Sequence, residues 1–187
     1  MDLAEYGSHS RFQFSNKLET LFQDSVDFRR AKKGEHLLRE GQMCDALYYL
    51  QSGTVRTYYI HDAQDVTSWF YRDGYFFTAW HSFYGDARSY EYIEVLEESE
   101  IMVLKKNEFE KLIQQEPDFA TFARILAEEQ TAFLDQYFKG YMFLSAKERY
   151  QLLLEFIPDI ELRSKLGNIA SFLGISQETL SRIRAGK

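Results

Sequence analysis

The spacing of hydrophobic residues changes several times along the chain, and each change marks a different kind of element. Residues 11–24 place Phe14, Leu18, Leu21 and Phe22 at helical spacing, which predicts a short amphipathic helix. We expect the apolar face of this helix to cover a sheet.

Between residues 26 and 104 the helical spacing gives way to short runs of strand-forming residues. The clearest runs are residues 46–50, 55–60 and 92–96, which are rich in Tyr, Ile, Val and Leu. Turn-forming pairs separate the runs at Gly34-Glu35, Gly41-Gln42, Ser52-Gly53, His61-Asp62 and Asp73-Gly74. Short strands separated in this way are typical of an antiparallel sandwich or barrel.

Two further helices are predicted after the strands, and the second is long. Asn107 can cap a short helix that ends near Gln115. Pro117 suits the first turn of a helix that reaches about Phe143. This long helix has two apolar stripes, one of Phe119, Phe122, Leu126, Phe133, Tyr137 and Tyr141, the other of Ile125, Leu134, Phe138 and Met142. Two stripes require two partners, so one is expected to cover the strands and the other to pair across a two-fold homodimer.

A separate helical unit is predicted after residue 144. Ser145 and Glu148 have the spacing of a capping box, so a helix is expected to begin there and to end near Phe156. Residues 158–165 are expected to form the hairpin of a wing.

The last twenty residues have the pattern of a helix-turn-helix. The apolar residues Ile169, Ala170, Phe172, Leu173, Leu180 and Ile183 lie on two short helical faces. Between them, Gly174 can adopt the left-handed conformation that ends a helix, and Ser176 can cap the next one. In such a motif the second helix enters the DNA major groove.

The second of these helices has a polar face that contains Gln177, Glu178, Ser181 and Arg182. Arg can donate two hydrogen bonds to guanine, and Glu can accept one from cytosine. Alternatively, Glu178 and Arg182 form only a surface ion pair, worth about 0.3–0.5 kcal/mol.

Two parts of the chain resemble the Crp/Fnr superfamily of bacterial transcription regulators. The run from Ile169 to Arg182, with Leu-Gly-Ile-Ser followed by Glu-Thr-Leu-Ser-Arg, resembles the recognition motif of that superfamily. The order Gly34-Glu35, Arg39-Glu40-Gly41, Leu47–Leu50, Ser52-Gly53 and Val55-Arg56 resembles the β-roll of its cyclic nucleotide-binding domains. The resemblance implies an α+β fold with an antiparallel, jelly-roll-like β-roll over 1–116, a dimerisation helix over 117–144 and a winged helix-turn-helix over 145–187.

The resemblance also implies a function and its residues. The expected protein is a homodimeric transcription regulator that binds a palindrome in double-stranded DNA and acts on RNA polymerase. The expected DNA contacts are Ser176, Gln177, Glu178, Thr179, Ser181, Arg182, Arg184 and Lys187. Thr179, Arg184 and Lys187 would contact phosphates, which position a protein on DNA without reading sequence.

The ligand-binding pattern of the family is incomplete in this chain. Family members that bind cyclic nucleotides have a Gly-Glu pair before an Arg that holds the phosphate, whereas Phe77 and Thr78 stand where that pair is expected. A cyclic nucleotide is therefore not the expected effector. An effector of unidentified chemistry is expected near Phe77, Thr78, Trp80, Arg88 and Ser89. The eleven aromatic residues between Trp69 and Tyr92 could line such a pocket or could simply form the core of the roll.

The charge distribution agrees with DNA binding at one end only. The chain of 187 residues has a net charge of −7. Residues 1–161 have 17 basic and 28 acidic groups, whereas residues 162–187 have five basic groups and one acidic group. A basic tip on an acidic body is the pattern expected of a protein that contacts DNA through that tip.

Two other classes of function are weaker alternatives. A cupin-like metal enzyme would require a set of His and carboxylate ligands, and the four histidines are scattered, so we expect no catalytic residue, metal or cofactor. A sensor or scaffold that has lost DNA binding would fit the net acidity. The single cysteine and the absence of a signal peptide or a long apolar run favour a cytoplasmic protein that does not enter a membrane.

Overall fold

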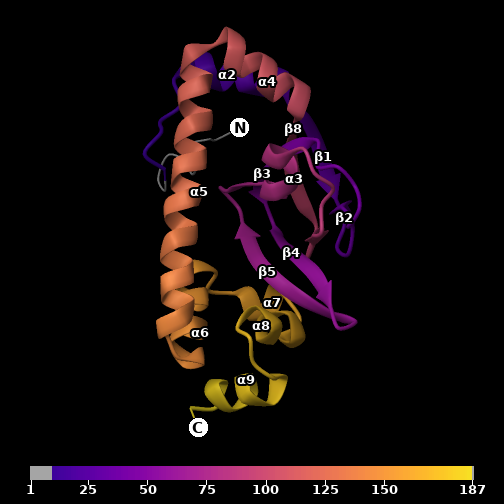
Figure 1. Ribbon diagram of the computed structural model, residues 1–187, viewed down its shortest axis with the longest axis vertical. Coiled ribbons are helices and arrows are strands. Elements are labelled where there is room, and N and C mark those ends of the chain that lie inside the picture. The colour runs from indigo at the N-terminus through magenta and orange to yellow at the C-terminus, as the bar shows by residue number, and fades with distance from the viewer. Residues whose placement is uncertain (1–9, 187) are drawn as a thin grey trace.

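The computed structural model describes residues 10–186, and its N-terminal half contains two four-stranded antiparallel sheets (Figure 1). One sheet has the order β1 (Asp27–Ala31), β8 (Ser99–Lys105), β3 (Ala46–Ser52) and β6 (Phe76–Phe77). The other has the order β2 (His36–Leu38), β7 (Tyr92–Val95), β4 (Thr54–His61) and β5 (Gln64–Arg72). This arrangement confirms the predicted antiparallel β-roll.

Tight turns connect the strands at the positions that the sequence indicated. Gly53 joins β3 to β4 with a φ of 109°, and a Cβ atom at this position would lie 2.1 Å from Ser99 Oγ. Only glycine fits there, for both conformational and steric reasons. Asp62 and Ala63 both have positive φ in the β4–β5 turn, which is the backbone of a type I′ hairpin.

Two of the short helices around the roll were predicted but begin at other residues, and a third was not predicted. Helix α2 (Asn16–Ser25) begins later than residue 11, and Phe22 packs edge-on against Phe76 of the sheet. Helices α3 (Trp80–Gly85) and α4 (Lys106–Gln115) flank the roll. The predicted Asn107 cap is wrong, because β8 runs directly into α4 and Lys105 occupies the N-cap position without a side-chain bond.

Helix α5 (Pro117–Phe143) extends along the roll for 27 residues (Figure 1). Phe119, Phe122 and Leu126 of the first predicted stripe are buried in the main core. In contrast, Leu134 and Phe138 of the second stripe are 47% and 64% exposed. The side chains of Tyr141 and Met142, which were assigned to these stripes, lie outside the described part of the structure.

Four helices follow α5: α6 (Ala146–Phe156), α7 (Ile160–Arg163), α8 (Leu166–Phe172) and α9 (Gln177–Arg184). The predicted capping box is confirmed, with Ser145 and Glu148 bonding reciprocally at the start of α6. The predicted wing hairpin over 158–165 is wrong, because this segment contains α7. Ile160 is fully buried there, and Asp159 pairs with Arg163 at helical spacing, 2.6 Å apart.

The described residues form two hydrophobic cores. The larger lies within the roll and is closed by α2, α4 and the first half of α5. The smaller contains residues of α6–α9 together with Phe70 and Leu96 of the roll, and Trp69 packs against both. The domain boundaries expected after residues 116 and 144 stay a prediction. No described helix is long and apolar enough to cross a membrane.

Candidate nucleic-acid interface

The turn between α8 and α9 has the backbone geometry that its sequence requires. Gly174 has a φ of 65°. Its N–H donates to Ser171 O at 3.1 Å, and the N–H of Ile175 donates to Ala170 O at 3.0 Å. These two bonds form a Schellman motif, which ends α8 and satisfies its last carbonyls.

Helix α9 is fixed at its start and along its inner face. The Ser176 hydroxyl accepts from the Thr179 N–H at 3.2 Å, as an N-cap does. Leu180 is fully buried in the smaller core, together with Ile169 and Ala170 of α8. The structure therefore holds α9 rigidly against α8.

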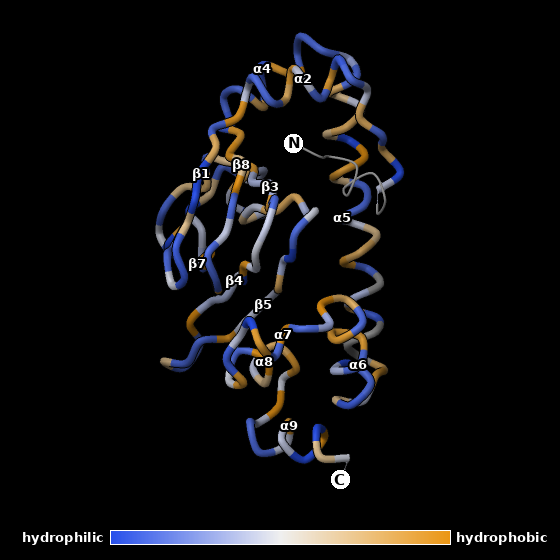
Figure 2. Tube along the Cα trace, turned by 180° about the vertical axis from the view of Figure 1, so that it is seen from behind, coloured by the Kyte–Doolittle hydropathy of each residue, from blue (hydrophilic) through white to orange (hydrophobic). Residues whose placement is uncertain are grey.

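The outer face of α9 presents four of the predicted DNA contacts to solvent: Gln177, Glu178, Ser181 and Arg182 are all exposed. The side chains of Glu178 and Arg182 are 86% and 71% exposed, and their charged atoms are 3.9 Å apart. An ion pair so loose and so exposed adds little stability. The Gln177 amide leans toward α8, where a Cβ on Gly167 would lie 3.0 Å from its Nε2. Hydrophilic positions dominate α9, which lies at the end of the molecule opposite α2 and α4 (Figure 2).

The other predicted contacts have different surroundings. Thr179 is half-buried, and its hydroxyl lies 3.1 Å from that of Ser176. Arg184 pairs with Glu161 of α7, with 2.6 Å between Arg184 Nε and a Glu161 oxygen. Lys187 lies outside the described residues.

Acidic side chains from outside residues 162–187 neutralise part of the predicted basic tip. Arg163 pairs with Glu97 of the roll at 2.8 Å, and Arg184 pairs with Glu161. Glu161 also accepts a hydrogen bond from the Tyr150 hydroxyl. Burial, followed by this bond, raises the pKa of Tyr150 to about 12. Exposed Lys165 and Arg182 remain as positive charge at this end of the chain.

Helix α8 docks directly on strand β5. The Ser171 hydroxyl accepts from the Thr67 N–H at 3.2 Å and donates to Thr67 Oγ1 at 3.1 Å. Thr67 Oγ1 also accepts from buried Arg56, which pairs with Glu94 at 2.6 Å. Phe172 completes the contact by packing edge-on against Phe70, with ring centroids 5.4 Å apart. The unit formed by the C-terminal helices is thus anchored to the roll by a continuous polar chain and an aromatic pair.

The residues expected near an effector belong to two environments. Phe77 and Thr78 are fully buried: Phe77 stacks on Tyr48, and the Thr78 hydroxyl donates to Ala46 O at 2.8 Å. Phe77 also pairs with Tyr48 in the β3–β6 ladder. These two residues are part of the roll core.

The remaining three expected effector residues differ in burial, since Trp80 is half-buried, Arg88 is exposed and Ser89 is buried. Trp80 donates to the Tyr71 hydroxyl at 3.3 Å, Arg88 is exposed and donates to Gly41 O at 2.6 Å, and buried Ser89 bonds to the main chain of Glu91.

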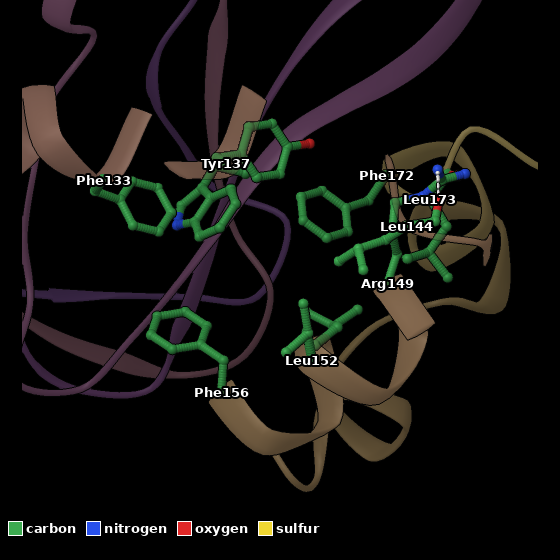
Figure 3. Close-up of a pocket in the computed structure, with 10 residues that line it drawn as sticks. Phe133, Tyr137, Leu144, Arg149, Leu152, Phe156, Phe172 and Leu173 are labelled. Carbon is green, nitrogen blue, oxygen red and sulfur yellow. Dashed lines mark hydrogen bonds between the residues drawn. The ribbon is translucent and has the colours of Figure 1, made fainter. Parts of the chain in front are cut away.

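A cavity of about 300 Å³ lies elsewhere, where β5, α5, α6 and α8 meet (Figure 3). It is lined by Trp69, Phe133, Tyr137, Leu144, Arg149, Leu152, Leu153, Phe156, Phe172 and Leu173. None of the five expected effector residues is among them. From the sequence, Phe133 and Tyr137 were assigned to a stripe of the long helix, and Phe172 and Leu173 to a face of the helix-turn-helix. No local pattern indicated that these faces would leave a cavity between them.

The roll is similar to a known family of domains. Residues 28–116 match the cyclic nucleotide-binding domain family. This match covers β1–β8 and α4, and it does not extend to the helices after residue 116. A search of curated proteins finds no match for the chain.

Solved structures share the fold over most of the chain. FixK2 of Bradyrhizobium japonicum is 18% identical, with a TM-score of 0.72 over 86% of this chain and 83% of that one. A protein of Eubacterium rectale assigned to the Crp/Fnr family of transcriptional regulators is 18% identical, with a TM-score of 0.71 over 92% and 83%. The c-di-GMP-responsive regulator CLP of Xanthomonas campestris is 16% identical, with a TM-score of 0.69 over 90% and 88%. At these identities the comparisons establish a common fold over most of the chain.

The His, Cys, Asp and Glu side chains of the described residues do not gather into a possible metal site. Within residues 10–186, no three His, Cys, Asp or Glu side chains lie close enough together to hold a metal ion.

Proposed function

We propose that this chain is a transcription regulator that binds a palindromic operator as a homodimer. The observation that supports the proposal most directly is the exposed polar face of α9. Glu178 and Arg182 stand side by side on a short helix that is capped by Ser176 and packs against α8 through its inner face. A helix held in place in this way, with exposed Arg and Glu side chains, is suited to the major groove.

Under this proposal, some side chains of α9 contact bases and others contact phosphates. Arg182 and Glu178 read a G·C pair, with Gln177 and Ser181 at neighbouring positions. Ser176 and Thr179 lie at the N-terminus of α9, where main-chain N–H groups and hydroxyls suit a phosphate. Arg184 can reach a phosphate only if it exchanges its bond to Glu161.

The exposed stripe of α5 supports a homodimer. Leu134 and Phe138 are one turn apart and together form an apolar surface beside the roll. The same stripe from a second chain would cover it around a two-fold axis. Two copies of α9 would then meet half-sites about one helical turn, or ~34 Å, apart.

The first experiment is selection of DNA duplexes from a random pool by the purified protein at two salt concentrations. The expected result is enrichment of a palindrome, with affinity that falls steeply as salt rises because counterions are released. A dimeric protein that enriches no sequence at either salt would favour the alternative, a sensing or scaffold module that has lost DNA binding.

A matched pair of variants tests the dimer. Phe138→Asp places a charge on the exposed α5 stripe, whereas Phe28→Asp changes an equally exposed residue on edge strand β1; the two are 64% and 62% exposed. Sedimentation is expected to show a monomer for F138D and a dimer for F28D. Dimers in both cases would exclude the α5 stripe as the interface.

A further inference from the structure

The cavity beside Trp69 is lined by residues of the roll, the long helix and the C-terminal helices. Each of these parts has a role in the proposed function. Trp69 belongs to the roll, Phe133 and Tyr137 to the long helix, and Phe172 and Leu173 to the end of α8 (Figure 3). A molecule in this space would contact the roll, the proposed dimerisation helix α5 and the helices proposed to bind DNA at the same time.

Aromatic edges and aliphatic side chains make up most of the wall. The Trp69 ring has Phe133, Tyr137 and Phe172 at centroid distances of 4.7, 5.2 and 5.3 Å, each near perpendicular. Such edge-to-face packing leaves ring faces and edges for a further aromatic partner. Leu144, Leu152, Leu153 and Leu173 form much of the remaining wall.

The charges at the cavity disfavour a cation. Arg149 is the charged residue among the described lining residues, and its guanidinium donates to Leu144 O and Leu173 O at 2.9 and 3.0 Å. The Arg72 guanidinium lies 5.5 Å from the centroid of Phe156, another wall residue. Moving a cation from water into this largely apolar space would cost its hydration, and none of the described lining residues is acidic to offset that cost.

The volume limits the size of the ligand. An apolar cavity of about 150 Å³ is known to hold benzene. A cavity of about 300 Å³ has room for about twice that volume, which corresponds to one or two rings.

We propose that this cavity binds a small neutral molecule with one or two apolar rings, and that this binding alters DNA affinity. The second part rests on the proposed function. The ligand would contact β5, α5, α6 and α8 together, so it would favour one placement of α8 and α9 relative to the roll. A ligand shifts such an equilibrium by the difference in its affinity for the two placements.

Indole is a suitable probe for the binding site, because it is neutral, apolar and bicyclic. Isothermal titration of the full chain is expected to show saturable binding of one indole per chain. Tryptamine has the same rings with an ammonium group, and it is expected to bind at least tenfold more weakly at pH 7.

Two matched variants locate the binding. Leu152→Trp fills the cavity from its rim, where Leu152 is 51% exposed, so a larger side chain fits without disturbing the core. Leu162→Trp makes the same change on α7 at a residue that is 88% exposed. Indole affinity is expected to fall at least tenfold in L152W and to stay unchanged in L162W. No saturable binding by the unmodified chain, or equal affinities in the two variants, would overturn the site.

Fluorescence anisotropy with the selected operator then tests the coupling. Saturating indole is expected to change operator affinity at least threefold in the unmodified chain and in L162W, but not in L152W. Operator binding that indole leaves unchanged would overturn the coupling alone. Saturable indole binding by a chain that selects no DNA would contradict the proposed function and leave the ligand site established.

Discussion

The side of the C-terminal helices that faces the roll is buried and hydrogen-bonded, whereas the side formed by α9 is open to solvent. On the inner side, Phe172 is 8% exposed and Ser171 bonds to Thr67 across the contact. On the outer side, the Glu178 and Arg182 side chains are 86% and 71% exposed. Both sides belong to one unit of four short helices.

Under the proposed function, anchoring and DNA recognition are therefore assigned to different residues. Changes on the inner side should lower stability or alter the placement of the unit, while changes on the outer side should affect DNA alone. The following variants test this separation.

Phe172→Ala should have the largest effect. The Phe172 ring contacts Trp69, Phe70 and Tyr137, and truncation of a buried Phe typically costs about 3–5 kcal/mol. Urea unfolding at fixed protein concentration measures the loss. Phe28→Ala, at an exposed position of β1, should change stability by no more than about 0.5 kcal/mol. Equal losses in F172A and F28A would show that the inner contact does not stabilise the unit.

Arg182→Ala should act on DNA and not on stability. Loss of a bidentate contact to guanine costs about 1–3 kcal/mol of discrimination at one base position. Operator binding and repeated selection measure this effect, and urea unfolding should be unchanged. Lys111→Ala removes another exposed cation, on α4 at the opposite end of the molecule (Figure 1), and should leave the operator preference intact. A preserved preference in R182A would remove Arg182 from the reading residues.

Ser176→Ala tests the boundary between the two sides, because the Ser176 hydroxyl caps the first turn of the exposed helix. Loss of an N-cap costs about 0.5–2 kcal/mol, measured by urea unfolding. Ser181→Ala on the outer face of the same helix serves as the control and should leave stability unchanged. If the two variants were equally stable, the observed Ser176–Thr179 bond would contribute nothing.

Mild acid should destabilise the roll through a group that α9 lacks, and this effect should be the smallest of the four. Burial, followed by the Arg39 charge, lowers the pKa of His36, against a smaller opposing effect of Glu94. The unfolded chain therefore binds more protons than the folded chain just below the ordinary value of about 6.5. Stability from this group is present above that value and is lost as pH falls toward the folded-state pKa.

Thermal unfolding between pH 7.5 and 5.5 measures this loss, which should be smaller in His36→Gln. The comparison of the two proteins is needed because burial raises the pKa of Glu91, and stability from Glu91 is lost as pH rises. All four histidines precede residue 82, so α9 has none to titrate. Identical pH profiles in H36Q and the unmodified chain would exclude His36 as the cause.

Features that depend on neighbouring residues could be predicted from the sequence. Helix α5 begins at Pro117 and ends at Phe143 as expected, and the Gly174 turn and Ser176 cap have the predicted geometry. Each follows from the backbone preference or the hydrogen-bonding groups of residues within one or two turns.

The wrong predictions arose where a distant partner decided the local structure. Residues 158–165 were expected to form a wing, but burial of Ile160 in the smaller core favours the short helix α7. Asn107 was expected to cap α4, but the Lys106 N–H instead bonds to Asp45 O beside β3, at 2.8 Å.

By itself, the sequence determined the strand-rich first half, the long helix with two apolar stripes and the polar face of α9. The tertiary structure alone decided that Glu97 and Glu161 neutralise Arg163 and Arg184, that Ser171 bonds to Thr67, and that Trp69 borders a cavity. The physical reason is the distance along the sequence between the residues that interact. Helical periodicity, caps and turns are set by residues a few positions apart, whereas Thr67 and Ser171 are separated by 104 positions, and only packing of the whole chain brings them together.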